Sequence, residues 1–218
     1  MRSGLAGILV LDFSTQIAGP YASKLFVDAG AEVIQVEPPG GDPLRRASAT
    51  GAPLGDRDSA LFRFLNAGKQ SVLGTATDAR VRALLAEADL AIEAHGLESD
   101  AGERLDAAAL RRSHPSLVVL SLTPYGLTGP WADRKATEFT LQAESGSLGI
   151  RGRMGREPYQ AGGRLTEWAA GTYGAVAALA AVLGARATGR GEHVDLSLLE
   201  TANFVYSNQS ETMNRLMN

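Results

Sequence analysis

One acidic side chain stands near the start of the longest apolar segment of the chain. Glu167 is the third residue of the run Leu165 to Ala187, which consists mainly of Ala, Leu, Val, Gly and Tyr. This composition predicts a helix that is buried on most sides and packs closely on a sheet. A first-turn Glu often interacts with the positive end of its own helix. The alternative is a functional carboxylate, and at this point both interpretations stay open.

Basic side chains in two other segments are candidates for binding an anion. Arg45 and Lys69 fall in loops on the predicted ligand side, where each is either a solvated surface charge or part of an anion site. The first βα turn, STQIAGP, contains neither G-x-G-x-x-G nor the P-loop pattern. The common nucleotide-binding motifs are therefore not present.

The histidines do not indicate a metal site. His95, His114 and His193 lack the spacing of metal ligands. The chain also has no cysteine, which excludes disulfides, cysteine nucleophiles and thiolate ligands. A Ser-His-Asp arrangement stays open, although no G-x-S-x-G turn occurs.

Length and charge narrow the class of protein. The 218 residues suffice for one sizeable α/β domain, and the net charge of −3 gives no basic footprint for nucleic acid or an anionic membrane. The first residues resemble a strand and not a signal peptide, and the apolar run near residue 175 is too short and too rich in Gly and Ala to cross a bilayer. We therefore expect a soluble cytoplasmic protein that binds neither nucleic acid nor membrane.

Apolar runs and their breakers predict alternating strands and helices. Strands are predicted at 8–13, 31–37, 70–73, 89–92, 117–122 and 193–198, and helices at 20–29, 58–66, 78–88, 106–113 and 165–187. This order predicts a Rossmann-like, doubly wound and mostly parallel sheet of about six strands. Ligands of such a sheet bind in the loops after the strands, here 14–19, 38–57, 93–100 and 123–135.

Six segments, in this order, resemble the family III CoA-transferases, which include the α-methylacyl-CoA racemases. They are GILVLDF with AGPYAS (7–23), GAEVIQVEPPGGDPLR (30–45), NAGKQS (66–71), YGLTGP (125–130), QAESG (142–146) and TGRGEHVDLSLLE (188–200). The resemblance implies the Rossmann-like part of the family's large domain over residues 1–200, with a C-terminal helix or polar tail over 201–218. Family members continue into a small domain and pair as interlocked chains, so we expect this sequence to hold the large-domain part without the small domain. The resemblance thus implies a homo- or hetero-oligomer.

The resemblance also implies a reaction. In the family, an Asp attacks an acyl-CoA thioester to give an anhydride and CoA thiolate. The thiolate then attacks the bound group, and an acceptor acid resolves the enzyme–CoA thioester. That Asp precedes a glycine by four residues, and counting back from Gly171 gives Glu167. The substrates would be a CoA thioester and a carboxylic acid, without a covalently bound cofactor or a metal.

The same resemblance assigns contacts with CoA. Those for the pantetheine arm are Gln16, Ile17 and Ala18, those for the phosphates are Arg45 and Lys69, and His95 stands in the strand-four loop. That loop usually reads N-F-x-P-G in the family, where this chain has Ala94, His95 and Gly96.

Three functions follow from the resemblance. The first is CoA transfer with Glu167 as the nucleophile, although Glu is longer than Asp by a methylene. The second is a non-catalytic subunit that completes a partner carrying the active Asp. The third is an acyl-CoA racemase, which would need a basic His where this chain has Thr137.

Overall fold

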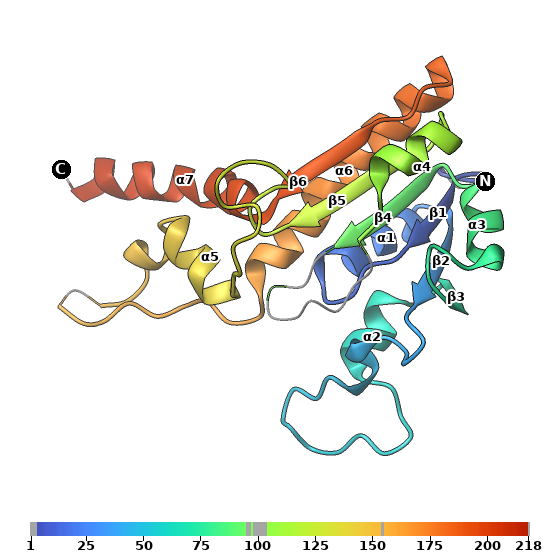
Figure 1. The fold of residues 1–218 in the computed structure, drawn as a ribbon. Coiled ribbons are helices and arrows are strands. Elements are labelled where there is room, and N and C mark those ends of the chain that lie inside the picture. The colour runs from blue at the N-terminus through green and yellow to red at the C-terminus, as the bar shows by residue number, and fades with distance from the viewer. Residues whose placement is uncertain (1–3, 95–96, 98–103, 154, 218) are drawn as a thin grey trace.

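Six parallel strands form the single sheet of the computed structural model, which describes residues 4–94, 97, 104–153 and 155–217 (Figure 1). The strands are β1 (Leu9–Asp12), β2 (Glu32–Glu37), β3 (Gln70–Leu73), β4 (Leu90–Ala94), β5 (Val118–Thr123) and β6 (His193–Ser197). Their order, β3-β2-β1-β4-β5-β6, is that of a doubly wound Rossmann-type sheet. The predicted fold class is confirmed. The strand order reverses between β1 and β4, so a ligand site is expected beyond their carboxyl ends.

Helices connect the strands. They are α1 (Ala18–Asp28), α2 (Ala60–Leu65), α3 (Ala79–Leu85), α4 (Ala107–Ser113), α5 (Glu138–Glu144), α6 (Leu165–Thr188) and α7 (Leu198–Met217), with 3-10 turns η1 (Pro43–Arg46) and η2 (Ser147–Ile150). Each helix predicted from the sequence is present. The sequence interpretation missed α5, and α7 begins directly after β6.

The central strands separate two cores. Val10, Leu90 and Val118 pair across β1, β4 and β5 and face the core that includes α1 and α6. Their neighbours along the strands belong to the opposite core, with α3 and α4. Figure 1 shows α1 and α6 together on one side of the sheet. Burial on both faces explains why these strands are nearly continuous apolar runs.

Glycines on α6 allow it to approach its neighbours closely. A Cβ atom on Gly171 would lie 2.6 Å from the carbonyl oxygen of Ala18, and one on Gly174 would lie 3.0 Å from a methyl group of Leu122. Because the Gly171 contact leaves no room for a side chain, α6 packs backbone to backbone against the start of α1, and Gly174 lets α6 lie close to β5. This close packing fixes where the first turn of α6 lies.

The opposite face of α6 is more exposed than the sequence predicted. Val176 and Leu183 are 66% and 56% exposed. The prediction of burial on most sides was therefore wrong for this face. Within the described ranges, α6 is the one helix long and apolar enough to cross a membrane. Its contacts with α1 and β5 are those of the core helix of an α/β fold.

Candidate active site

Glu167 is a buried carboxylate at the meeting point of two helix starts. It lies in the first turn of α6 and is only 2% exposed. Its Oε2 accepts a hydrogen bond of 3.0 Å from the backbone N–H of Ile17, the N-cap residue of α1. The positive ends of α1 and α6 therefore both favour the ionised carboxylate.

The spacing between Glu167 and Gly171 has a direct structural reason. Residues four apart lie on the same face of a helix, so both face the start of α1. Gly171 allows the backbone of Ala18 to come near, and Glu167 then reaches the N–H of Ile17. The spacing that pointed to Glu167 in the sequence thus corresponds to a packing arrangement.

Arg164 is the counter-ion of Glu167. Its Nε pairs with Oε1 of Glu167, and its Nη1 donates a hydrogen bond of 2.6 Å to Oε1 of Gln16. Gln16 and Arg164 have φ values of 70° and 57°, and no other non-glycine residue in the described ranges has a positive φ. Left-handed backbone at a non-glycine residue costs free energy and is concentrated at functional sites. Here two such residues meet beside one carboxylate.

Opposing influences act on the pKa of Glu167. Burial raises it and is the largest effect, whereas the Arg164 guanidinium and the backbone N–H groups of Ile17 and Ala18 lower it. The nearby charge of Glu138 raises it further, and the net result is a pKa above the ordinary value for Glu. A raised pKa makes a carboxylate more basic, and it is common for groups that do chemistry.

Glu138 is a second buried carboxylate that the sequence interpretation missed. It begins α5 and is 5% exposed. Its Oε1 accepts hydrogen bonds from the backbone N–H of Thr166 at 2.9 Å and from Nε2 of Gln142 at 2.8 Å. A capping box between Thr137 and Thr140 fixes the start of α5. The spacing T-x-x-T was the available signal, weaker than the usual Ser or Thr followed by Glu.

Four polar side-chain atoms in and around Glu167 are buried without a hydrogen-bond partner in the described part of the chain. They are Oε1 of Glu167, which is ion-paired with Nε of Arg164, Oγ1 of Thr166, Oε2 of Glu138 and Nη2 of Arg164. Such atoms are rare in folded proteins, because each forfeits the hydrogen bond it would make with water. Oε2 of Glu138 and Nη2 of Arg164 belong to residues that interact with Glu167, which fits a site whose ligand supplies the missing partners.

The first βα turn lies directly against Glu167. Gln16 contacts Arg164, and the backbone of Ile17 and Ala18 meets the carboxylate. The structure thus brings Gln16, Ile17 and Ala18 together with Glu167. Their contact with the pantetheine arm stays a prediction.

Lys69 is more deeply buried than the sequence suggested, with its side chain 1% exposed. Its ammonium contacts Oδ2 of Asp12 at 3.3 Å, and donates to the carbonyl oxygen of Pro20 and to Oδ1 of Asn66, both at 2.9 Å. Burial lowers its pKa, and the charge of Asp12 opposes that effect. Since three protein oxygens take up its three N–H groups, this geometry favours a structural role. Its contact with a CoA phosphate stays a prediction.

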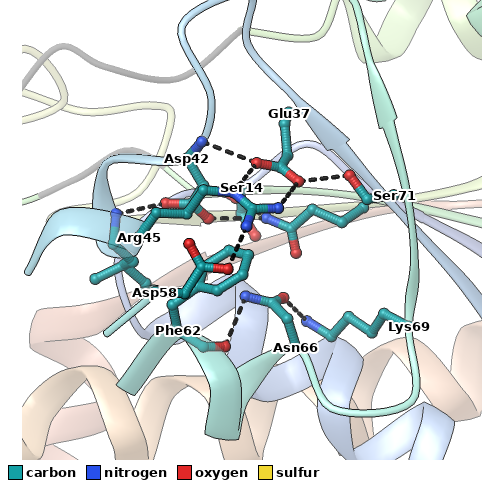
Figure 2. Close-up of polar contacts among 11 residues, drawn as sticks. Ser14, Glu37, Asp42, Arg45, Asp58, Phe62, Asn66, Lys69 and Ser71 are labelled. Atoms are coloured by element: carbon teal, nitrogen blue, oxygen red, sulfur yellow. Dashed lines mark hydrogen bonds and ion pairs between the residues drawn. The ribbon is translucent and has the colours of Figure 1, made fainter. Parts of the chain in front are cut away.

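Arg45 is held by two carboxylates of its own surroundings (Figure 2). It makes a bidentate pair with Glu37, at 2.7 and 2.6 Å, and a third bond of 2.6 Å to Asp58. Its guanidinium also lies 4.0 Å from the ring centre of Phe62. The hydrogen bonds from Arg45 lower the pKa of Glu37 to about 2. The contact of Arg45 with a CoA phosphate likewise stays a prediction.

The predicted contact of His95 falls outside the described residues. The described residues contain no group of three His, Cys, Asp or Glu side chains that could hold a metal ion.

A serine and a histidine do meet, on the sheet. Oγ of Ser121 lies 2.9 Å from Nε2 of His193, but its hydroxyl donates to Glu93 at 2.5 Å and Ser121 is fully buried. This is not the arrangement of a nucleophilic serine, whose hydroxyl donates to the histidine.

Comparison with known proteins identifies relatives of this chain. Residues 5–217 match the sequence model of CoA-transferase family III. The chain is 35% identical to a succinate–glutarate CoA-transferase of Agrobacterium fabrum, over 94% of this chain and 54% of that protein. It is 34% identical to the BbsE subunit of a succinyl-CoA:(R)-benzylsuccinate CoA-transferase of Thauera aromatica, over 93% and 50%.

The fold comparison agrees. A CAIB/BAIF family protein from Brucella suis superposes with a TM-score of 0.85 at 32% identity, covering 100% of this chain and 58% of that one. The chain spans about half the length of the curated relatives it matches.

Proposed function

Because this chain belongs to CoA-transferase family III, we propose that it carries the nucleophile of an enzyme that moves CoA from an acyl-CoA to a carboxylic acid. The observation that supports this most directly is the position of Glu167. Its carboxylate is withdrawn from water, paired with Arg164 and aimed at the backbone N–H of Ile17. Relatives that are named for CoA transfer between acids support the same class of reaction.

The proposed reaction proceeds through Glu167 in four steps. A carboxylate oxygen of Glu167 attacks the thioester carbon, the C–S bond breaks, and CoA leaves as a thiolate, with an anhydride on Glu167. The thiolate attacks the Glu167 carbonyl carbon, which releases the donor acid and leaves a Glu167–CoA thioester. The acceptor carboxylate attacks that thioester and releases the thiolate again. The thiolate then attacks the acceptor acyl carbon, which forms the new acyl-CoA and frees Glu167.

The backbone N–H groups at the start of α1 would stabilise the charge that develops in these steps. Each attack on the Glu167 carbonyl carbon makes a tetrahedral centre with a negative oxygen. The N–H of Ile17, 3.0 Å from Oε2 in the free protein, is placed to donate to that oxygen. A fixed donor of this kind contributes about 2–4 kcal/mol to transition-state stabilisation in comparable enzymes.

A second candidate function is a CoA-transferase-like subunit that does no chemistry itself. One observation favours it: by the resemblance, Glu167 occupies the place where the family has Asp. The racemase reading gains no support from Thr137, whose hydroxyl accepts the N–H of Thr140 and caps α5.

The two leading functions differ in whether Glu167 becomes modified. The protein would be incubated with succinyl-CoA and trapped with hydroxylamine or borohydride, and the Glu167 peptide would then be analysed by mass spectrometry. We expect a modified Glu167, and no modification of that peptide in Glu167→Gln. An unmodified Glu167 in a protein that still binds CoA would support the non-catalytic subunit.

A further inference from the structure

We propose that Arg164 is the substrate carboxylate-binding residue of this site: it pairs with Glu167 in the free protein and with the reacting carboxylate of the acid substrate while Glu167 is held as the CoA thioester. The inference rests on the proposed function of Glu167. Three properties of Arg164 carry it: its unusual place at the start of α6, its unused N–H groups, and the charge changes at Glu167.

Helix formation does not explain an arginine at this position. Arg164 is the N-cap residue of α6 and makes no side-chain cap hydrogen bond. Ser, Thr, Asp or Asn would normally stand there, and a positive charge is unfavourable beside the positive end of a helix. Its φ of 57° adds a further cost. The contacts with Glu167 and Gln16 offset these costs. The role of the Arg164 side chain is therefore to make these contacts and not to cap the helix.

The guanidinium has hydrogen-bonding capacity left over. Nε faces Glu167 and Nη1 donates to Gln16. Nη2 is buried and has no hydrogen-bond partner in the described ranges, although the side chain as a whole is 31% exposed. A planar guanidinium with a free nitrogen beside an exchangeable carboxylate is well suited to bind another carboxylate through two parallel bonds.

The proposed reaction changes the charge beside Arg164. In the free protein, Arg164 and Glu167 form a neutral pair. When Glu167 becomes a thioester, it has no charge, and the partly buried guanidinium loses its counter-ion. At that stage the donor acid has just been released, or the acceptor acid is about to attack, and each carries one carboxylate charge. If that carboxylate takes the place of Glu167, the site returns to the same net charge.

The surroundings make this role specific to Arg164. Glu138 lies nearby, and its negative charge opposes the entry of another anion. The positive ends of α1 and α6 favour an anion, but the N–H groups of Ile17 and Ala18 at the start of α1 are directed to Glu167, and the N–H of Thr166 in α6 is directed to Glu138. Among the described groups that contact Glu167, only Arg164 carries a full positive charge and a free donor.

The test separates binding of the acid from binding of CoA. Glu167–CoA thioester would be formed from succinyl-CoA in the wild type, in Arg164→Gln and in Arg164→Lys. Its discharge by a series of glutarate concentrations would then be followed. Arg156→Gln is the matched control, since Arg156 is an exposed arginine in the loop before α6.

In Arg164→Gln, we expect the glutarate concentration for half-maximal discharge of the thioester to be at least about tenfold higher than in the wild type. The succinyl-CoA concentration for half-maximal adduct formation should stay within about twofold, because the charged pair binds the acid and not CoA. Arg164→Lys should need a glutarate concentration between those of the wild type and of Arg164→Gln, and Arg156→Gln should match the wild type.

The outcomes distinguish the two proposals. Adduct in the wild type with an unchanged glutarate dependence in both Arg164 variants would contradict the role of Arg164 and leave the proposed function standing. A wild type that forms no adduct would contradict both. If Arg164→Gln does not fold, Arg164→Lys carries the test alone, because a lysine keeps the charge but cannot make the parallel pair.

Discussion

Ile17 and Glu167 are 150 positions apart in the chain, yet the backbone N–H of the first donates a 3.0 Å hydrogen bond to the carboxylate of the second. This bond exists because α1 and α6 approach each other at Gly171. It connects the first βα turn, where ligands of doubly wound sheets commonly bind, with the proposed nucleophile.

Replacing Gly171 by Ala should destabilise the protein by about 1–3 kcal/mol, because the new Cβ would lie 2.6 Å from a backbone oxygen. Gly184 is a matched control on the same helix, since a Cβ there would meet nothing within 4 Å. Gly184→Ala should be stabilising by about 0.5–1 kcal/mol. Urea denaturation measures both, and equal effects would show that the α1–α6 contact is not tight.

Formation of the Glu167 adduct should depend on pH. The attack needs the ionised carboxylate, so the rate should rise with pH, with a midpoint above the ordinary pKa of Glu. Arg164→Gln removes a charge that lowers this pKa, so its midpoint should move to higher pH. Initial rates of adduct formation over a pH series would show the shift. A midpoint that moves to lower pH would contradict the ion pair.

Glu138→Gln should shift the same midpoint in the opposite direction. The charge of Glu138 raises the pKa of Glu167, so its removal should lower it. The amide oxygen of Gln can still accept the N–H of Thr166, which keeps the start of α6 in place. The same pH series measures the effect, and an unchanged midpoint would mean that the two carboxyl groups do not interact.

Lys69→Met should cost about 3–5 kcal/mol of stability, since it leaves the fully buried Asp12 carboxylate without its counter-ion. Arg63→Met, at an exposed position on α2, should change stability by no more than about 0.5 kcal/mol. Chemical denaturation gives both values. If Lys69→Met were as stable as the wild type but bound CoA more weakly, Lys69 would be a ligand contact and not a structural cation.

Asp42 should make stability depend on pH between about 4 and 6. Burial raises the pKa of Asp42 from 3.8 to about 6, so the folded state holds a proton that the unfolded state has lost. Its contribution is therefore fully present below pH 3.8 and declines as pH rises through 6, by about 3 kcal/mol in total. The free energy of unfolding of wild type minus that of Asp42→Asn should fall over this range. A difference that rises with pH would contradict the raised pKa of Asp42.

Part of the fold could be predicted from the sequence, and particular residues show why the rest of the fold could not. The strands around Leu11 and Leu120 were evident because burial on both faces leaves long apolar runs. The helix of Glu138 was not, because it is seven residues long and its cap pairs two threonines.

The sequence points to the candidate site only where local spacing encodes it. The resemblance places the nucleophile four residues before a glycine, and counting back from Gly171 gives Glu167. The contact of Glu167 with Ile17, and that of Arg164 with Gln16, depend on packing between distant segments, which no local pattern encodes. The sequence left Lys69 as either a surface charge or part of an anion site, because lysines seldom lie fully buried, and only the fold places it against Asp12.

The most direct test of the central claim follows oxygen from the acceptor acid into the protein. Glutarate labelled with oxygen-18 in its carboxylates would be supplied with succinyl-CoA, and the Glu167 peptide would be analysed after turnover. If the acceptor attacks a Glu167 thioester, its bridging oxygen stays on Glu167 when the thiolate takes the acyl group, so the peptide gains the label. Formation of glutaryl-CoA with no label on Glu167 would contradict the account.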